Sequence, residues 1–127
     1  MINIIILVTV GGAVGAMLRE FAMLMVPPLA DGFPMDILVA NVLAAFLLGL
    51  VSALHSRRVL SDSVNTMLGT GVMGGLSTFS SFVYAPVVLM AASTQSAVVA
   101  LAYVVVSVVV GYIAVIAGQK LGGQGTA

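Results

Sequence analysis

The sequence predicts an all-α integral membrane protein with four transmembrane helices, the third of which is broken. The chain is 61% hydrophobic and only 6% charged, with a mean hydropathy of +1.27, whereas soluble proteins average about 25% charged residues. Its apolar runs are long enough to cross a bilayer, which takes about 20 residues. Residues 63–119 carry no charge, yet Gly, Ser and Thr cluster in their middle. These observations indicate membrane crossings with one interruption.

The four helices are expected over residues 2–25, 37–54, 64–91 and 97–117. Pro27 and Pro28 end the first helix, because proline lacks the N–H and clashes with the preceding turn. The uncharged run is too long for one crossing, and the polar residues 92–96 can form the turn between two. The sequence therefore predicts four crossings.

A flexible tail is expected over the glycine-rich residues 120–127, and the whole chain, 1–127, forms a single four-helix membrane domain. Four crossings place both termini on one side of the membrane. An excess of Lys and Arg marks the cytoplasmic side, and the side with the termini holds most of the basic residues, Arg57, Arg58 and Lys120. We expect a multi-pass protein of the cell membrane with cytoplasmic termini, and insertion in both orientations stays open.

The composition also argues against several classes of function. Lys+Arg and Asp+Glu number four each, so no charged field points to a nucleic-acid partner. The absence of Cys excludes disulfides and thiol chemistry. The single histidine, His55, cannot build a metal site alone.

Small residues recur at a spacing of four, which lets helix backbones approach closely. The pairs are Gly11 and Gly15, Ala45 and Gly49, Gly71 and Gly75. Two polar residues inside the predicted helices each have two interpretations. Asn41 can bond a neighbouring helix or donate to a pore. Arg19 can be functional or can extend from the end of its helix to the membrane surface.

Residues 74–82 (GGLSTFSSF) predict the break in the third helix. Non-helical backbone at membrane depth is tolerated only where it is buried in protein or lines a wet cavity, and its free carbonyl and N–H groups can bind ions. Phe79 and Phe82 follow at a spacing of three, on one helical face. Their weakly positive ring edges can meet an anion, or the rings simply pack.

Two hydroxyls share a face of the fourth helix. Tyr103, Ser107 and Gly111 are spaced at i, i+4 and i+8, which places them on one side of a helix. This pattern indicates a polar track, or alternatively helix packing through the serine.

These residues resemble the Fluc (CrcB) family of fluoride channels. The resemblance rests on residues 11–19 (GGAVGAMLR), on residues 39–41 (VAN) followed by Gly49, and above all on residues 74–82, which are close to the family signature GGxTTFSTF. It covers nearly the whole chain. It implies a passive, fluoride-selective channel that exports cytoplasmic fluoride and limits its toxicity, with no enzymatic activity and no organic cofactor.

The resemblance further implies an antiparallel dimer with two pores. Each pore would be lined by Asn41, Phe79, Ser80, Phe82, Tyr103 and Ser107. Arg19 would lie near the pore mouth. A structural sodium ion at the dimer centre would be held by the backbone carbonyls of Gly74 and Ser77 in each subunit. If so, a side-chain change at Ser77 should matter less than a change at Gly74, where a Cβ would crowd the break. The expected partners are fluoride, membrane lipid and a second copy of the chain.

The chain departs from the family pattern at five positions, Glu20, Asp36, Ile37, Gly111 and Val115. The family usually has hydroxyl residues at the last two, so the conduction rate stays open, as does pairing with an oppositely oriented paralogue. Two other functions remain as alternatives. One is a small drug/proton antiporter that uses Glu20 as its titratable carboxylate, and the other is a membrane subunit that transports nothing.

Overall fold

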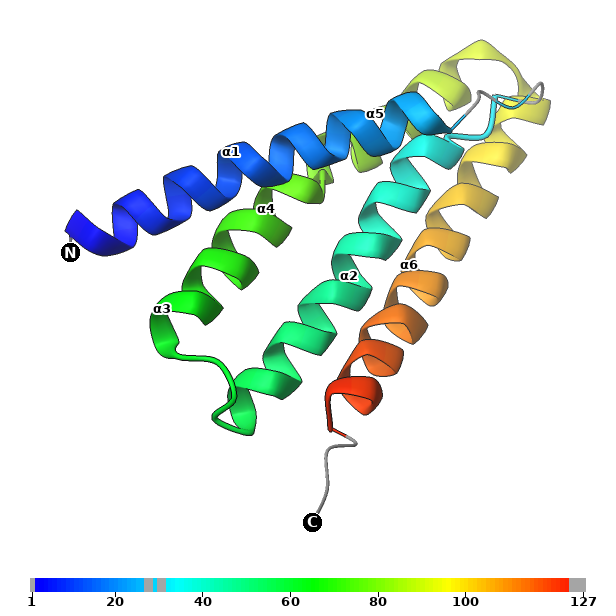
Figure 1. The fold of residues 1–127 in the computed structure, drawn as a ribbon. Helices are drawn as coiled ribbons and strands as arrows, with labels where there is room; N and C mark the ends of the chain where they lie inside the picture. The colour runs from blue at the N-terminus through cyan, green and yellow to red at the C-terminus, as the bar shows by residue number, and fades with distance from the viewer. Residues whose placement is uncertain (1, 27–28, 30–31, 124–127) are drawn as a thin grey trace.

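The computed structural model describes residues 2–26, 29 and 32–123, and that part of the chain contains helices and no strand. In chain order the elements are α1 (Ile2–Met25), α2 (Met35–Ser56), α3 (Asp62–Asn65), the π-helix η1 (Thr66–Val72), α4 (Met73–Leu76), α5 (Phe79–Ala92) and α6 (Thr94–Gly123) (Figure 1). Elements α3 to α5 form one interrupted segment. Together with α1, α2 and α6 it gives four segments long and apolar enough to cross a membrane. The predicted fold class is confirmed.

Helices α2 and α6 lie side by side and run in the same direction (Figure 1). Glycines permit this close approach. A Cβ on Gly49 would overlap the carbonyl oxygen of Val115, and one on Gly118 would overlap that of Phe46. The interpretation of Gly49 as a packing residue is therefore confirmed.

Helix α1 crosses the interrupted segment and packs on η1 and α4. Glycines on both sides of this crossing leave no room for side chains. A Cβ on Gly15 would overlap the carbonyl oxygen of Val72, and one on Gly75 would overlap that of Gly12. The predicted small-residue pairs in these two segments therefore serve backbone contact.

The fourth crossing is longer at both ends than predicted. Helix α6 begins at Thr94 because Ser93 caps it: its Oγ accepts a hydrogen bond from the Ser96 N–H at 3.1 Å. The predicted flexible tail is wrong for residues 120–123, which are helical. Gly122 is buried against α2, and its carbonyl accepts a hydrogen bond from Arg57 Nη1 at 2.8 Å. Residues 124–127 lie outside the described residues, as do Pro27 and Pro28.

The other boundaries agree with the prediction within two residues. Helix α3 starts at Asp62 because the Ser61 side chain accepts a hydrogen bond from the Val64 N–H. The π-helix η1 was not predicted. A π-helix is defined by hydrogen bonds between residues five apart, and at the end of η1 the Met73 N–H donates to the Leu68 carbonyl, five residues back.

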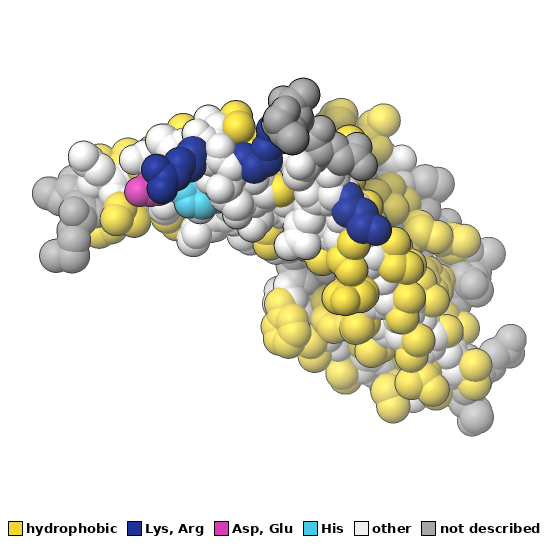
Figure 2. All heavy atoms as spheres, turned by 90° about the horizontal axis from the view of Figure 1, so that it is seen from below, with side chains coloured by type: hydrophobic (Ala, Val, Ile, Leu, Met, Phe, Trp, Pro, Cys, Tyr) yellow, Lys and Arg dark blue, Asp and Glu magenta, His cyan; other side chains and the backbone are white. Residues whose placement is uncertain are grey.

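Polar groups gather at the end of the molecule where α2 meets α3. His55 Nε2 lies 3.6 Å from Asp62 Oδ1, and His55 Nδ1 lies 3.2 Å from the Leu60 carbonyl. Figure 2 shows the molecule from below, with basic, acidic and histidine side chains exposed and apolar surface continuing away from them. This distribution suits a polar end beside a lipid-facing body.

Candidate functional site: the break in the third crossing

The break consists of two extended residues between α4 and α5. Ser77 has φ −74° and ψ 155°, and Thr78 has φ −141° and ψ 106°. Neither pair of angles continues a helix. The predicted interruption is therefore confirmed, and it falls after Leu76 and before Phe79.

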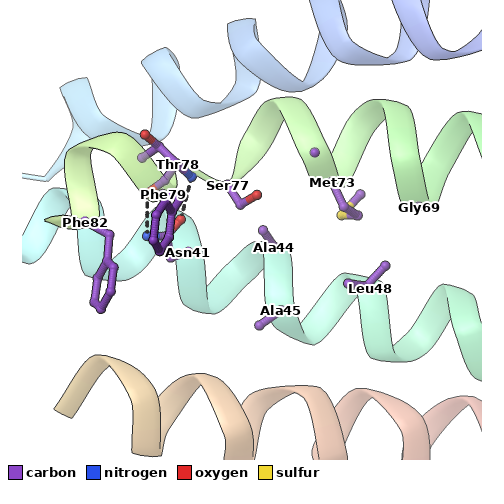
Figure 3. A pocket seen from close by; sticks show the side chains of 11 residues that line it. Asn41, Ala44, Ala45, Leu48, Gly69, Met73, Ser77, Thr78, Phe79 and Phe82 are labelled. Carbon is purple, nitrogen blue, oxygen red and sulfur yellow. Dashed lines mark hydrogen bonds between the residues drawn. The ribbon is translucent and has the colours of Figure 1, made fainter. Parts of the chain in front are cut away.

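Asn41 of α2 holds the break in place. The Thr78 N–H donates to Asn41 Oδ1 at 2.7 Å, and Asn41 Nδ2 donates to the Thr78 carbonyl at 3.2 Å (Figure 3). The interpretation of Asn41 as a bond between helices is confirmed. An amide nitrogen carries two hydrogens, so one N–H of Asn41 remains for a second partner, and its role as a pore donor stays a prediction.

Thr78 is a site residue that the sequence analysis missed. Its side chain caps α5, because Oγ1 accepts a hydrogen bond from the Ser81 N–H at 3.3 Å. Oγ1 also lies 3.0 Å from Ser81 Oγ and 3.4 Å from Ser80 Oγ. With an exposed fraction of 6%, Thr78 is shielded from solvent. A threonine immediately before the second helical half was the available signal, since Ser and Thr favour this capping position.

Arg19 of α1 reaches the same break from another side. Its Nη1 donates to the Gly75 carbonyl in the last turn of α4 at 3.2 Å. A cation there complements the negative end of a helix and satisfies a carbonyl that has lost its helical donor. Arg19 therefore binds the broken helix instead of extending to the membrane surface. Its predicted place near a pore mouth is not tested.

A cavity of about 400 Å³ opens along the break. Five of the predicted site residues line it, namely Asn41, Gly74, Ser77, Phe79 and Phe82, together with Thr78 and residues of α2, η1 and α4 (Figure 3). None of its lining residues carries a charge. Within the single chain a Cβ built at Gly74 has no heavy atom within 4 Å, so the expected crowding does not come from this chain and stays a prediction for a dimer. The glycine faces open space in the single chain.

The two phenyl rings lie next to each other, as their spacing predicted. The ring centroids of Phe79 and Phe82 are 6.1 Å apart, with 39° between the ring planes. Phe82 also contacts Tyr103 of α6 at a centroid distance of 5.7 Å, whereas Phe79 is 79% exposed in the single chain. Phe82 thus connects the cavity to the core, and Phe79 stands at the surface.

The predicted track hydroxyls lie behind Phe82 on α6. Tyr103 is fully buried, and neither its hydroxyl nor that of Ser107 has a hydrogen-bond partner among the described residues. Buried polar atoms are normally paired. These two hydroxyls are neighbours one helical turn apart, and their role as a polar track stays a prediction. Ser80 is exposed on α5 and does not line the cavity. The structure thus brings most predicted residues around the break and separates Ser80 from the cavity.

None of the residues that line the cavity at the break is titratable. Glu20, the carboxylate of the antiporter alternative, is exposed and does not line the cavity at the break. Within residues 2–26, 29 and 32–123, no group of three or more His, Asp and Glu side chains could hold a metal ion. A cation held at the break would therefore bind neutral oxygens, from the backbone or from the Asn41, Ser77 and Thr78 side chains that line the cavity.

Comparison with known proteins gives one consistent result. Residues 6–119 match the family model described as CrcB-like protein, Camphor Resistance (CrcB). A protein of Brucella melitensis named Fluoride-specific ion channel FluC 2 is 65% identical over 122 residues, which are 96% of this chain and 45% of that protein. A Yersinia pseudotuberculosis protein named Fluoride-specific ion channel FluC 3 is 57% identical over 94% of this chain and 89% of its own length. A Deinococcus radiodurans protein named Fluoride-specific ion channel FluC is 43% identical, over 90% of each chain. The chain spans less than half the length of the Brucella relative and most of the other two.

Proposed function

Because the chain belongs to the CrcB family, we propose that it is a passive, fluoride-selective channel that lets the ion leave the cell and so limits its toxicity. It is a multi-pass membrane protein. The relatives that it matches over most of their length are named fluoride-specific ion channels, which supports the choice of ion. This function requires no catalysed reaction.

The cavity at the break is the observation that carries the proposal. It presents an amide, a broken backbone and two phenyl rings without a charged side chain. Fluoride is small and strongly hydrated, so closely placed donors must replace its water. Donors without a full charge also hold the ion weakly enough to release it. The chemistry of the cavity therefore suits passage of an anion.

Each group around the cavity would act on the ion in turn. The remaining N–H of Asn41 donates to it, and the positive edges of Phe79 and Phe82 face it. Behind Phe82, the unpaired hydroxyls of Tyr103 and Ser107 continue the path. Ser80, exposed next to Thr78 Oγ1, would accept or release the ion at the end of the path.

We propose that two copies associate in opposite orientations and form two pores. The strongest support is the surface position of Phe79, because a ring that is 79% exposed in one chain needs a second surface to enclose an ion path. The open space beside Gly74 lies along the same cavity. A heterodimer with an oppositely oriented paralogue is the alternative assembly.

We further propose that the Gly74 and Ser77 carbonyls hold a structural sodium ion. Hard cations prefer oxygen ligands, and Gly74 and Ser77 both line the cavity at the break. No described backbone N–H donates to either carbonyl across the break. Both carbonyls therefore retain lone pairs for a cation.

Fluoride efflux from liposomes tests the proposal. Vesicles loaded with potassium fluoride and containing the purified protein are diluted into fluoride-free buffer, and a fluoride electrode follows release after valinomycin removes the opposing voltage. We expect passive release that is the same at pH 6.5 and 8, with no release in a parallel chloride experiment. Release that depends on a proton gradient would support the antiporter, and no release would support a subunit without transport.

A further inference from the structure

We infer that Asn41 and Thr78 are the positioning residues of the cation site, because their side chains capture the two backbone N–H groups that would otherwise bond the Gly74 and Ser77 carbonyls. The inference rests on the sodium site of the proposed function and explains how one chain creates it. It assigns Thr78 a role beyond capping.

The first captured group is the Thr78 N–H. In a continuous α-helix it would donate to the carbonyl four residues back, which is that of Gly74. In the structure it donates to Asn41 Oδ1 at 2.7 Å. The same amide donates back to the Thr78 carbonyl at 3.2 Å, so Asn41 fixes Thr78 in its extended conformation. The Gly74 carbonyl therefore loses its helical donor to a side chain of another helix.

The second captured group is the Ser81 N–H. Its helical acceptor would be the Ser77 carbonyl, but it donates to Thr78 Oγ1 at 3.3 Å. The hydroxyl of Thr78 is oriented in turn by Ser81 Oγ at 3.0 Å. Because Thr78 is buried, water does not compete for these bonds. In a continuous helix, the two captured N–H groups would therefore donate to the Gly74 and Ser77 carbonyls, which are the two proposed sodium ligands.

Capture by a side chain changes what a carbonyl can bind. Inside a helix, the carbonyl oxygen accepts a hydrogen bond from a backbone N–H with one of its lone pairs. The hydrogen of that N–H carries partial positive charge and repels a nearby cation. When that N–H is redirected, both the lone pair and the space become available. If either capture is removed, the N–H can return to its helical carbonyl and compete with the ion.

A purely structural role predicts a different behaviour. A cap or an interhelical bond stabilises the fold by the same amount whether or not sodium is present. A positioning role makes the loss of stability depend on sodium, because an ion that binds only the folded protein raises its stability according to concentration and affinity. The two roles are therefore separable by titration.

The experiment uses the purified full-length protein in detergent. The midpoint of thermal unfolding is measured by circular dichroism as sodium replaces N-methyl-D-glucamine at constant ionic strength. We expect the midpoint of the parent to rise with sodium. Thr78→Val keeps the shape of the side chain and removes the acceptor, and Asn41→Leu removes both bonds of the amide. Each substitution should raise, by up to about tenfold, the sodium concentration at which half of the rise in the unfolding midpoint is reached.

Two variants serve as controls. Thr78→Ser keeps the capturing oxygen and should retain the sodium dependence of the parent. Ser93→Ala removes an equivalent cap, the one on the Ser96 N–H, far along the chain from the break. It should lower the midpoint equally at every sodium concentration.

Two results would overturn the inference. One is an unchanged half-effect concentration in both Thr78→Val and Asn41→Leu, since the residues would then only hold the fold. The other is a parent whose unfolding does not respond to sodium. Fluoride efflux is measured separately. Efflux from a protein whose stability does not depend on sodium would contradict the inference alone, whereas sodium-dependent stability without efflux would contradict the proposed channel function. Substitutions at two positions keep the titration readable if one variant does not fold.

Discussion

Asn41 and Thr78, 37 residues apart in the chain, exchange two hydrogen bonds, one through each end of the Asn41 amide and both with the Thr78 backbone. The pair converts an interruption that would be costly in a membrane into a defined structure, because unpaired backbone groups have no water to bond at that depth. The same amide lines the cavity. The Asn41 side chain therefore both fixes the backbone of the broken helix and lies in the proposed ion path.

Replacement of Asn41 by Asp should abolish fluoride conduction. A fixed negative charge repels the anion, and the carboxylate can no longer donate to the Thr78 carbonyl. Liposome efflux measures the effect, and Asn3→Asp, at an exposed position early in α1, is the matched control. Near-normal flux in folded Asn41→Asp protein would exclude Asn41 from the ion path.

Replacement of Phe79 or Phe82 by Leu should severely reduce fluoride current while the dimer stays intact. Leucine keeps much of the apolar volume but lacks the positive ring edge. Phe21→Leu, at an exposed position of α1 outside the cavity, should conduct like the parent. If the Phe79 and Phe82 variants conduct equally well, the rings only pack, and Ser80, Tyr103 and Ser107 must line the pore.

Removal of the unpaired hydroxyls should separate stability from flux. Tyr103→Phe and Ser107→Ala each delete one of two neighbouring buried hydroxyls that form no well-aligned hydrogen bond, and a buried polar atom left unsatisfied costs about 1–3 kcal/mol. The free energy of unfolding should therefore stay equal or rise, whereas fluoride efflux should slow. Unchanged efflux in both variants would mean that the hydroxyls do not form a track.

Loss of the Arg19 guanidinium should destabilise the protein. Arg19→Gln removes a charged donor from the Gly75 carbonyl, a bond worth about 1.5–3 kcal/mol. Thermal unfolding measures the loss, and Lys120→Gln, at an exposed position near the end of α6, should have little effect. Equal stability of Arg19→Gln and the parent would mean that the bond to Gly75 contributes nothing.

Added methyl groups should distinguish packed glycines from open ones. Gly15→Ala places a Cβ onto the Val72 carbonyl, and we expect a destabilisation of about 1–3 kcal/mol from overpacking. Gly111→Ala meets no atom within 4 Å and gains up to about 1 kcal/mol of helix propensity. Thermal unfolding of the two variants should therefore shift in opposite directions, and a stable Gly15→Ala protein would contradict the crossing of α1.

The sequence predicted the crossings and the presence of the break, because both depend on local properties of the chain. A long apolar run favours a membrane crossing, and a cluster of Gly, Ser and Thr weakens a helix. It could not place the break between Leu76 and Phe79, since that position depends on Asn41 in another helix. It also could not separate Gly74 from Gly75. The first faces open space and the second touches the Gly12 carbonyl, and only the crossing with α1 makes them differ.

The end of α6 was mispredicted for a similar reason. A glycine-rich stretch usually indicates a tail, yet Gly122 lets the helix approach α2, where Arg57 bonds its carbonyl. Composition indicates the structure that a segment favours in isolation. The position of the break and the helical end of α6 both depend instead on contact with α2. The bond of the Thr78 backbone N–H could not be predicted for the same reason, because its partner Asn41 lies on α2.

The reversal potential in a planar bilayer tests the central claim most directly. Sodium is kept equal on the two sides, fluoride is tenfold higher on one side, and chloride is tenfold higher on the other. A fluoride-selective channel should reverse near the fluoride equilibrium potential, about 59 mV from zero for a tenfold gradient of a monovalent ion. Reversal near the chloride potential, which has the opposite sign, or the absence of current from folded protein would contradict the account.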